Sequence, residues 1–523
     1  MVNFHSYLTD QRIVAQLCKE VSKYIFCPPN RPMPEHVRHL LRLLPSRHLW
    51  ANLSYDQRHD KDVRKVTIRR LQHIIIRHLD HHSSYAYLPR LQAFMDSLRS
   101  FANEPNSYSF PKPVVKAKIK KQKGNLVVCR PTCAYHDLTA KMLTALMASY
   151  LKSWLDPMLH ETNMAYRAPR EWCGTENVVT SNVHAVDLLL RWRAKHHEQT
   201  IYIAECDICK FFDTIDHEDV IMVLRLMMAR CGIEDAHFAN LFANFVRSFD
   251  FQQDVMSCND NPDYWRSQFG EEANSHTYCF EWIDNPPQRP IGIPQGVALS
   301  PLIANMLLNV IDEQTLGERM VDGHIVDDQL LYVRYCDDIL IAHTSLHECT
   351  QILDAYCNAL EQHHLRYHPL QSVAAMKDGR NLKRDAKNHY LFWDAKSKRP
   401  YRWGTGLGNS AQWIGFLGYE ISRDGHIRLR KSSIAGQAEK IIKQALRIRF
   451  CQKYRQTMIE QFEKRAIGGS KIDALSNITD QSPFNLQRAK LEKLKARKLR
   501  GLTNSFIQDN AILSVASPDA NVC

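Results

Sequence analysis

The sequence predicts an α+β fold that is flanked by helical segments at both ends. Residues 200–430 alternate apolar, strand-like runs with helical patterns, which is typical of a domain that mixes a sheet with helices. Residues 1 to about 105 contain few glycines and read as mainly helical. A helical and strongly basic pattern returns from Ser432 onward.

Changes in composition along the chain suggest where these parts meet. Turn residues and two prolines gather at 106–113, which predicts a boundary there. The segment at about 250–290 is aromatic, polar and rich in turn residues, and we interpret it as an insertion. The expected division is therefore a helical N-terminal extension, two central regions and a helical C-terminal region, at 1–105, 106–200, 201–430 and 431–523.

Charge and cysteine content narrow the class of protein. The 523 residues carry a formal net charge of +12, which favours a polyanionic partner. No secretory signal and no membrane-spanning run is recognisable, so we expect a cytoplasmic protein without a membrane partner. The fifteen cysteines are an odd number scattered through a long chain, which indicates reduced thiols. Cys206 and Cys209 have CxxC spacing, but no second pair completes a zinc site.

Two adjacent aspartates stand between two apolar, β-prone runs. The segment from Leu330 to Ala342 predicts a strand, a tight turn and a second strand, with Asp337 and Asp338 at the tip. Like charges at one tip repel unless a cation joins them, and a pair of divalent metal ions that serves phosphoryl transfer would do so. The alternative is an ordinary acidic turn, since aspartate is common in turns.

A second acidic block lies upstream, at 202–217. Asp207 falls at the end of a predicted strand, and Asp213 or Thr214 is expected to cap the helix that follows. If the two strands are neighbours, the carboxylate of Asp207 meets the Asp337–Asp338 tip. Three carboxylates would then hold two metal ions.

A glycine-rich turn precedes an apolar helix at 290–305. Gly292 and Gly296 surround a Pro-Gln pair, so the bare backbone can approach a nucleotide closely. Ser300 and Pro301 then begin the helix. Taken alone, such a turn is more often structural.

Basic residues concentrate in three places. Lysines crowd into a predicted hairpin at 112–128, and the helical stretch 64–82 carries a basic and histidine-rich face. A third cluster lies at 488–500. These surfaces are either solvated helix faces or sites that bind an RNA backbone. The residues that we expect to contact RNA are Arg64, Arg69, Arg70, Arg488, Lys493 and Arg497.

The order of these blocks resembles that of the reverse transcriptases, especially the bacterial enzymes related to those of group II introns. The first acidic block is similar to their first acidic motif, PQGVALSP at 294–301 to the motif before the catalytic hairpin, and YCDD at 335–338 to the YxDD signature. WIGFLGY at 413–419 resembles the primer-grip hairpin. The resemblance extends over roughly residues 110 to 430 and includes two motifs of the fingers, with Arg130, Pro131, Asp137 and Lys141 in the first and Tyr166, Arg167 and Ala168 in the second.

This resemblance implies a right-hand polymerase fold and a metal-dependent active site. The fingers would be 106–200, the palm 201–430 and the thumb 431–523. Asp207, Asp337 and Asp338 would be catalytic and bind two Mg²⁺ ions, with Mn²⁺ as the alternative, and the carbonyl of Ile208 would add a ligand.

The resemblance also implies residues that bind dNTPs and the primer. Phe212 stands where the family has a steric gate against the ribose 2′-OH, although a buried core aromatic is the alternative. Gln295 and Gly296 would contact the incoming nucleotide, and Arg130 would neutralise its triphosphate. The primer grip would be Leu417, Gly418 and Tyr419.

One departure from the family concerns proton transfer. The family usually has a Lys-Thr pair after the catalytic hairpin, whose lysine protonates the leaving pyrophosphate, whereas this chain has HPLQS at 368–372. Glutamine cannot donate a proton in that way. His368, Lys377 or metal-bound water would have to substitute, so the general acid is unassigned.

Features outside the core suggest a branch of the family. No endonuclease segment of the intron type and no NAxxH or VTG element of the retron type is recognisable. This profile is most similar to the stand-alone bacterial reverse transcriptases that act in phage defence with a structured noncoding RNA and produce DNA. The alternatives are an intron- or retron-type enzyme, synthesis that copies little template or is primed by protein, and a nucleic-acid-binding scaffold with a dead site.

Overall fold

The structure is a computed structural model, in which the chain folds into two compact units. The first unit comprises 1–176, 208–326 and 354–367, and the second comprises 177–207, 327–353 and 368–523. The residues that the structure describes are 2–24, 35–50, 57, 61–81, 84–122, 125–271, 278–372, 382–385, 387–393, 395–450, 455–464 and 482–515.

The first unit is mainly helical. Its elements are α1 (Phe4–Tyr7), α2 (Asp10–Ser22), α3 (Glu35–Arg42), η1 (Arg47–Leu49), α5 (Lys61–Asp80), α6 (Leu88–Asn103), η2 (Pro105–Ser107), β1 (Val114–Gln122), β2 (Asn125–Ala134), α7 (Leu138–Leu155), η3 (Asp156–Met158), β3 (Arg170–Trp172), α9 (Phe211–Thr214), α10 (His217–Arg230), α11 (Ala236–Arg247), α12 (Phe251–Asp254), η4 (Met256–Asp260), α13 (Pro262–Phe269), α14 (Ser300–Leu316), η5 (Gly317–Arg319), β6 (Met320–Val321) and β7 (His324–Ile325). The helices before residue 105 agree with the helical extension that the sequence predicts.

The second unit contains the largest sheet and a group of C-terminal helices. Its elements are α8 (Asn182–Lys195), β5 (Ile201–Asp207), β8 (Leu330–Tyr335), β9 (Asp338–His343), β10 (Leu370–Gln371), β11 (Leu382–Arg384), β12 (Tyr390–Trp393), β13 (Ser397–Trp403), β14 (Ser410–Ala411), β15 (Trp413–Phe416), β16 (Tyr419–Ser422), β17 (Ile427–Leu429), α16 (Lys431–Arg449), α17 (Arg455–Lys464) and α19 (Ser482–Val515). Two elements, β4 (Thr175–Val178) and α15 (Leu346–Gln362), continue from one unit into the other. The predicted mixture of sheet and helices is therefore confirmed.

The largest sheet brings distant parts of the sequence together. Its strand order is β10-β13-β5-β9-β8, and β14 pairs with β13. Strand β5 lies between β13 and β9 and is antiparallel to both. Residues of β8 and β9 are buried along nearly their whole length, because both strands are continuous apolar runs. This burial fixes the register of the strands.

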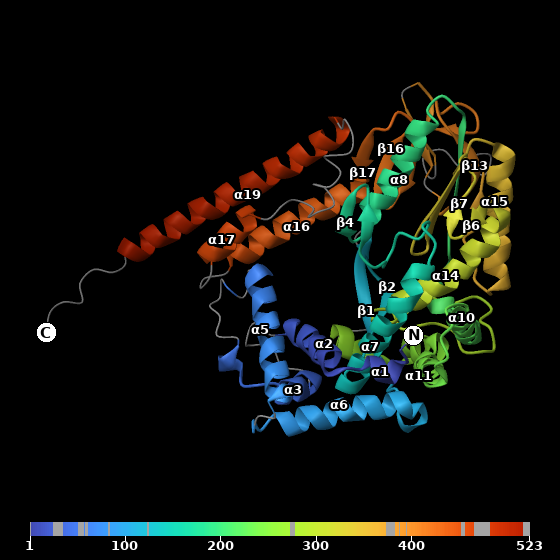
Figure 1. The fold of residues 1–523 in the computed structure, drawn as a ribbon. Helices are drawn as coiled ribbons and strands as arrows, with labels where there is room; N and C mark the ends of the chain where they lie inside the picture. The colour runs from blue at the N-terminus through green and yellow to red at the C-terminus, as the bar shows by residue number, and fades with distance from the viewer. Residues whose placement is uncertain are drawn as a thin grey trace. The chain divides into compact units, whose positions relative to one another are not determined.

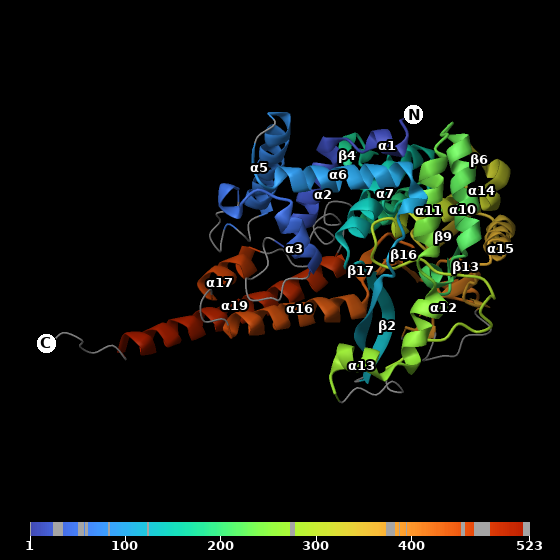
Figure 2. The same ribbon diagram turned by 90° about the horizontal axis from the view of Figure 1, so that it is seen from below.

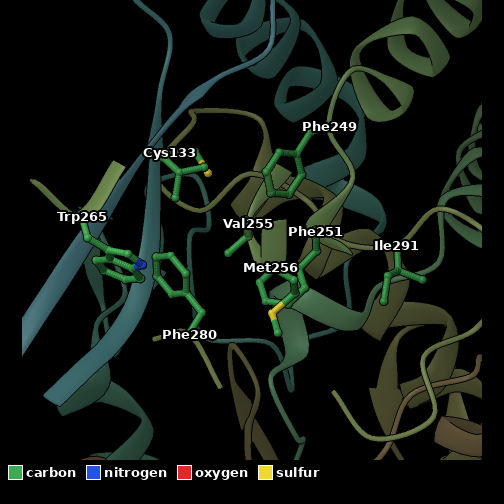
Figure 3. Packing of buried hydrophobic residues seen from close by; sticks show 9 residues of the cluster. Cys133, Phe249, Phe251, Val255, Met256, Trp265, Phe280 and Ile291 are labelled. Atoms are coloured by element: carbon green, nitrogen blue, oxygen red, sulfur yellow. The ribbon is translucent and has the colours of Figure 1, made fainter. Parts of the chain in front are cut away.

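The segment at 250–290 forms helices and a small core with the β1–β2 hairpin. Trp265 of α13 is fully buried and packs near Phe280, with 5.5 Å between the ring centroids. These rings share one cluster with Cys133 of β2 (Figure 3) and with Val115 of β1. Helix α13 accordingly lies beside β2 (Figure 2). The segment therefore supports the basic hairpin, an association that its turn-rich composition did not reveal.

The C-terminal helices pack into a core of their own. Helix α19 contacts both α16 and α17 (Figure 1). The buried residues between them are Ile441, Ala445, Ile448, Ile459, Phe462, Leu491 and Leu502. The helical pattern that begins near Ser432 is thus confirmed. Among the described helices, none has an apolar stretch long enough to cross a membrane.

Candidate active site

The predicted strand–turn–strand around the paired aspartates is confirmed. Strands β8 and β9 are antiparallel, and Tyr335 pairs with Asp338 across the turn. Cys336 in the turn has a positive φ of 58°, a conformation that a tight turn imposes on it. Asp337 therefore lies in the turn itself, and Asp338 begins β9.

The third aspartate lies on the neighbouring strand, as the sequence predicted. Asp207 is the last residue of β5, and the β5–β9 register places it opposite Asp338. Because directly opposed residues of antiparallel strands have Cβ atoms about 5 Å apart, the two carboxylates belong to one site. The structure thus brings Asp207, Asp337 and Asp338 to the same end of the sheet.

Asp207 lies beside a lysine and a histidine of the second unit. Its Oδ2 lies 3.0 Å from Lys396 Nζ and 3.8 Å from His368 Nε2. Lys396 Nζ is also 3.0 Å from His368 Nε2. The backbone is fixed as well, since the Asp207 N–H donates to Ser397 Oγ and its carbonyl accepts from the His368 N–H. A cation therefore stands next to this carboxylate.

A second acidic side chain nearby is neutralised by a buried lysine. Glu205 accepts hydrogen bonds of 2.8 and 2.9 Å from Lys398 Nζ and one of 2.9 Å from the Tyr401 hydroxyl. Lys398 is only 2% exposed, so this pair holds β5 and β13 together at low solvent access. The pairing reduces the negative charge that Glu205 adds to the site.

The neighbouring carboxylates affect the pKa of Asp338. Desolvation by the surrounding protein, followed by the charges of Asp337 and Asp207, raises the pKa of Asp338 to about 6. The side chain itself is exposed, so water weakens the effect of desolvation, whereas the repulsion from the two neighbouring carboxylates remains. A positive charge at this end of the sheet would relieve the repulsion.

These residues have the donor chemistry of a site for hard divalent cations. Mg²⁺ and Mn²⁺ prefer carboxylate and carbonyl oxygens, which Asp207, Asp337 and Asp338 supply. In the described part of the chain, however, no three His, Cys, Asp or Glu side chains are already arranged as a metal site. Asp207 instead forms an ion pair with Lys396. The donor atoms of these residues suit divalent ions. An ion could bind Asp207 only after Lys396 had moved away from its carboxylate.

A second predicted block lies in the first unit, around Gln295. The side-chain amide Nε2 of Gln295 donates to Asp213 Oδ1 at 2.7 Å. The backbone carbonyl of Gln295 accepts from the Cys133 N–H at 2.7 Å. Gly296 has φ +108°, and an added Cβ would lie 3.1 Å from the Cys133 carbonyl oxygen. Glycine is therefore required where the turn approaches the end of β2.

The two phenylalanines of the first acidic motif differ in burial. Phe211 is 2% exposed and belongs to the core, whereas the ring of its neighbour Phe212 is only partly buried. The Phe212 carbonyl accepts from the Ile293 N–H at 2.8 Å, which connects the motif to the glycine-rich turn. Arg130 is exposed, and its charge acts on buried Asp213. Four predicted nucleotide residues thus lie in one unit, and the role of Phe212 as a gate stays a prediction.

The expected helix cap was wrong. Helix α10 is capped by Asp216, whose side chain accepts from the N–H groups of Glu218 and Asp219. Asp213 instead lies within the short helix α9, where Gln295 holds its carboxylate. Thr214 bonds back to carbonyls of the preceding turn. Asp216 lies directly before the helix, which is the position that a cap requires.

Burial of Asp213 predicts a pH-dependent contribution to stability. Burial raises its pKa from 3.8 to about 6, against the opposing effects of the Gln295 hydrogen bond and of Lys210. Since the pKa is higher in the folded than in the unfolded chain, the folded state binds this proton more tightly. The free energy of unfolding should therefore fall, by as much as ~3 kcal/mol from this group, as pH rises from about 4 to above 6.

The isosteric variant Asp213→Asn keeps an acceptor for Gln295 and removes the titration. Urea unfolding at pH 4 and pH 7 should show that the wild type loses more stability than the variant across this interval. A difference between the two proteins that does not change with pH would contradict the expectation.

The predicted primer-grip segment forms a hairpin. Strands β15 and β16 pair antiparallel, and the two-residue turn between them is Leu417 and Gly418, with φ of +49° and +90°. Positive φ at both positions matches the turns that join tightly twisted strands. Tyr419 is buried, which raises its pKa to about 12, with an opposing hydrogen bond from Asn182.

The residues expected to bind RNA lie on two helices. Arg69 and Arg70 are exposed on α5, and Arg64 on the same helix is partly buried. On α19, Lys493 and Arg497 are exposed. Arg488 is partly buried and donates to Glu492 at 3.0 Å. The two helices belong to different units, and each presents basic side chains to solvent.

Sequence patterns did not reveal several residues of the site. Lys396, Ser397 and Lys398 reach it because β13 pairs with β5, almost two hundred positions earlier, and nothing in their local sequence marks them. Arg334, fully buried behind the turn, donates to the Cys336 carbonyl at 3.3 Å. Of the two side chains considered as a general acid, His368 lies near Asp207, and Lys377 lies outside the described residues.

Comparison with known proteins places the chain in a family. The family model "Reverse transcriptase (RNA-dependent DNA polymerase)" matches residues 118–421, more than half of the chain. No curated protein matches the chain.

Among solved structures, the chain is similar to two telomerases from Candida in complex with a TWJ fragment of telomeric RNA. For the Candida albicans protein, the identity is 10%, the TM-score is 0.31, and the match covers 89% of this chain and 76% of the other. For the Candida tropicalis protein, the values are 11%, 0.35, 94% and 78%. An apo telomerase from Candida tropicalis, truncated from its C-terminal domain, is 10% identical with a TM-score of 0.34, over 82% of this chain and 79% of the other. On the family match, the chain belongs to the reverse transcriptase family and is an RNA-directed DNA polymerase, a nucleotidyltransferase.

Proposed function

We propose that Asp207, Asp337 and Asp338 are the catalytic residues and hold two divalent ions, with the Ile208 carbonyl as a further ligand. Reverse transcriptases use divalent metal ions, and Mg²⁺, with Mn²⁺ as the alternative, suits this oxygen donor set. The observation that carries the proposal is the register that opposes Asp207 to Asp338 beside the Asp337 turn. When bound, the ions supply charge stabilisation at the attacking and leaving oxygens of the transferred phosphate.

Residues of the chain position the carboxylates that would bind the ions. The rigid β5–β9 pairing keeps two carboxylates at fixed backbone positions, so that little reorganisation is needed during reaction. Lys396 forms an ion pair with Asp207 and would have to move away to let Asp207 bind an ion. The Glu205–Lys398 pair supports the strand that carries Asp207.

We infer a nucleotide site from Phe212, Gln295, Gly296 and Arg130. The partly exposed ring of Phe212 is available to exclude a ribose 2′-OH. Asp213 orients Gln295 through its side chain, and Cys133 fixes the backbone. Arg130 is an exposed cation suited to the triphosphate of a dNTP.

The family assignment supports a right-hand polymerase, with an N-terminal extension at 1–105, fingers at 106–200, a palm at 201–430 and a thumb at 431–523. The helical core of α16, α17 and α19 supports the thumb assignment. We propose that Leu417, Gly418 and Tyr419 form the primer grip, because they lie at the turn of a hairpin.

We further propose that the enzyme is a cytoplasmic bacterial protein that copies a structured noncoding RNA into DNA for defence against phage. Two exposed basic helix faces and the net charge of +12 support an RNA partner. The alternatives are synthesis that copies little template, protein-primed synthesis, and an intron- or retron-type enzyme. Sequencing the DNA and RNA that copurify with the protein distinguishes them: complex DNA complementary to the RNA supports templated synthesis, whereas a homopolymer contradicts it.

The basic face of α19 gives a separate prediction about RNA. Reversing the charge of Arg488, Lys493 and Arg497 to glutamate should weaken binding of the copurifying RNA, because phosphate contacts release counterions. Loss of three contacts should reduce the slope of log K against log salt by about two. Binding measured at several salt concentrations tests this expectation.

A matched control reverses the charge of three exposed basic residues elsewhere in the chain, Arg90, Arg225 and Lys387. It changes the net charge equally and should leave the slope closer to that of the wild type. Unchanged affinity and slope in the α19 variant would mean that this face is only a solvated thumb surface.

A further inference from the structure

A buried histidine at the start of α10 contacts the glycine-rich turn. His217 is the first residue of this helix and is 2% exposed. Its Nε2 lies 2.7 Å from the carbonyl oxygen of Gly292. The turn that contains Gly292 continues directly to Gln295 and Gly296. His217 therefore touches the backbone that presents two residues of the proposed nucleotide site.

The geometry determines which nitrogen of His217 carries the proton. A backbone carbonyl can only accept a hydrogen bond, so the proton resides on Nε2, which donates it to Gly292. The buried Nδ1 has no hydrogen-bond partner among the described residues. Burial lowers the pKa of His217, against the opposing effect of the Gly292 hydrogen bond, so the ring is neutral at neutral pH. The side chain thus acts as a single, uncharged donor to the turn.

Backbone hydrogen bonds attach the same turn to the first acidic motif. The Gly292 N–H donates to the Ile215 carbonyl at 2.7 Å. The Ile293 N–H donates to the Phe212 carbonyl at 2.8 Å. All of these residues belong to the first unit. The spacing between Phe212 and the turn therefore depends on a few bonds around Gly292, and His217 supplies one of them.

The opposite side of the turn is closely packed. Gly292 has φ +92°, and an added Cβ would lie 2.7 Å from Phe251 Cβ and 3.2 Å from the Asp213 carbonyl oxygen. The Phe251 N–H donates to the Ile291 carbonyl at 2.8 Å, and both residues belong to the apolar cluster in Figure 3. The turn is thus held between this cluster and the start of α10, where His217 is the side chain that bonds to it.

We propose that His217 is a positioning residue for nucleotide selection, which holds the Gly292 carbonyl and thereby keeps Gln295 and Gly296 at a fixed distance from Phe212. The inference rests on the nucleotide site proposed above and adds a residue that does not touch the nucleotide. Selection between sugars needs the groups on both sides of the sugar to keep their spacing, because a shift of about 1 Å is enough to lose a productive geometry.

The test compares two amide variants of the full-length enzyme in steady-state DNA synthesis. His217→Gln places an amide N–H near the position of Nε2, whereas the shorter His217→Asn places it near Nδ1, out of reach of the Gly292 carbonyl. The Asn variant should raise KM for dNTP by about fivefold or more and change kcat less than about twofold, since a buried carbonyl loses its donor and the turn can shift. The Gln variant should keep KM close to that of the wild type.

A control variant separates positioning from a general loss of stability. Phe238→Leu alters the fully buried packing against Phe4 and Tyr150 in the same unit. It should lower the unfolding temperature and leave KM for dNTP unchanged. An unchanged KM in the Asn variant, or an equal rise in the Phe238→Leu variant, would overturn the proposal.

Gln295→Ala, measured in parallel, separates the two proposals. If KM for dNTP does not change in this variant, the nucleotide site is refuted, and the role of His217 is refuted with it. If KM rises in Gln295→Ala but not in His217→Asn, the nucleotide site stands and only the role of His217 is overturned.

A measurement on the wild type decides the question if the Asn variant does not fold. In protein labelled with ¹⁵N-histidine, the protonated Nε2 of His217 is identified by the loss of its resonance in the Gln variant. A dNTP is then added to the complex with a template and a primer that ends in a dideoxynucleotide, so that no bond forms. The resonance should shift on dNTP binding, because the nucleotide contacts the turn that His217 holds. An unchanged resonance at saturating dNTP would contradict the proposal.

Discussion

Replacing both Asp337 and Asp338 by alanine is expected to abolish DNA synthesis. The two residues lie at the turn and first position of the β8–β9 hairpin, opposite Asp207. Asp207 alone cannot hold two ions in line with the reacting phosphate. Since bound metal stabilises the transition state by several kcal/mol and each ~1.4 kcal/mol is a factor of ten, the rate should fall by at least about a thousandfold.

The measurement is incorporation of labelled dNTPs by purified proteins at equal concentration. Folding should persist in the double variant, because Asp337 and Asp338 lie at the end of the hairpin and removal of mutually repelling charges relieves strain. Asp328→Asn serves as a control, since the Asp328 side chain forms an exposed pair with Lys195 of the same unit and is not a proposed metal ligand. Near-normal synthesis by the double variant would refute the assignment of the active site.

Local sequence patterns predicted the β8–β9 hairpin well because its strands are buried. Continuous apolar runs on both sides of the two aspartates leave little freedom in where the chain turns. Strand β5 is only partly buried, yet its end at Asp207 was also predicted. The glycine-rich turn before α14 was predictable because Pro301 suits the first turn of a helix.

Contacts between distant segments were not predictable from local patterns. Lys396 and Lys398 enter the site only through the pairing of β13 with β5. The aromatic residues of 250–290 resembled an exposed insertion, but in the structure Trp265 and its neighbours bury themselves against the β1–β2 hairpin. The cap of α10 was misplaced by two or three residues, because Asp213, Thr214 and Asp216 are all of residue types that cap helices and only Asp216 directly precedes the helix.

The burial of Phe212 also could not be read from its sequence. Two adjacent phenylalanines have equal apolar character, and the direction of each ring depends on the short helix α9. The structure buries Phe211 and leaves Phe212 partly exposed, with the two ring centroids 5.4 Å apart. Each residue is therefore the natural control for the other.

Phe212→Ala is expected to admit ribonucleotides. If the partly exposed ring excludes a 2′-OH from the nucleotide site, its removal opens space for that group without removing any metal ligand. Discrimination that rests on excluding one hydroxyl is worth about a hundredfold, so the ratio of rNTP to dNTP incorporation should rise by roughly 10- to 100-fold. The ratio is obtained from kcat/KM for one nucleotide pair on the same primer and template.

Phe211→Ala should give the opposite pattern. Loss of a buried phenylalanine creates a cavity and costs about 3–5 kcal/mol of stability, while the sugar preference of the enzyme that remains folded should be unchanged. Comparing the two variants separates a gate from a packing role, because stability and selectivity are measured independently. If Phe212→Ala lowers the unfolding temperature as much as Phe211→Ala and leaves the nucleotide ratio unaltered, the ring of Phe212 serves packing, and sugar selection depends on another residue.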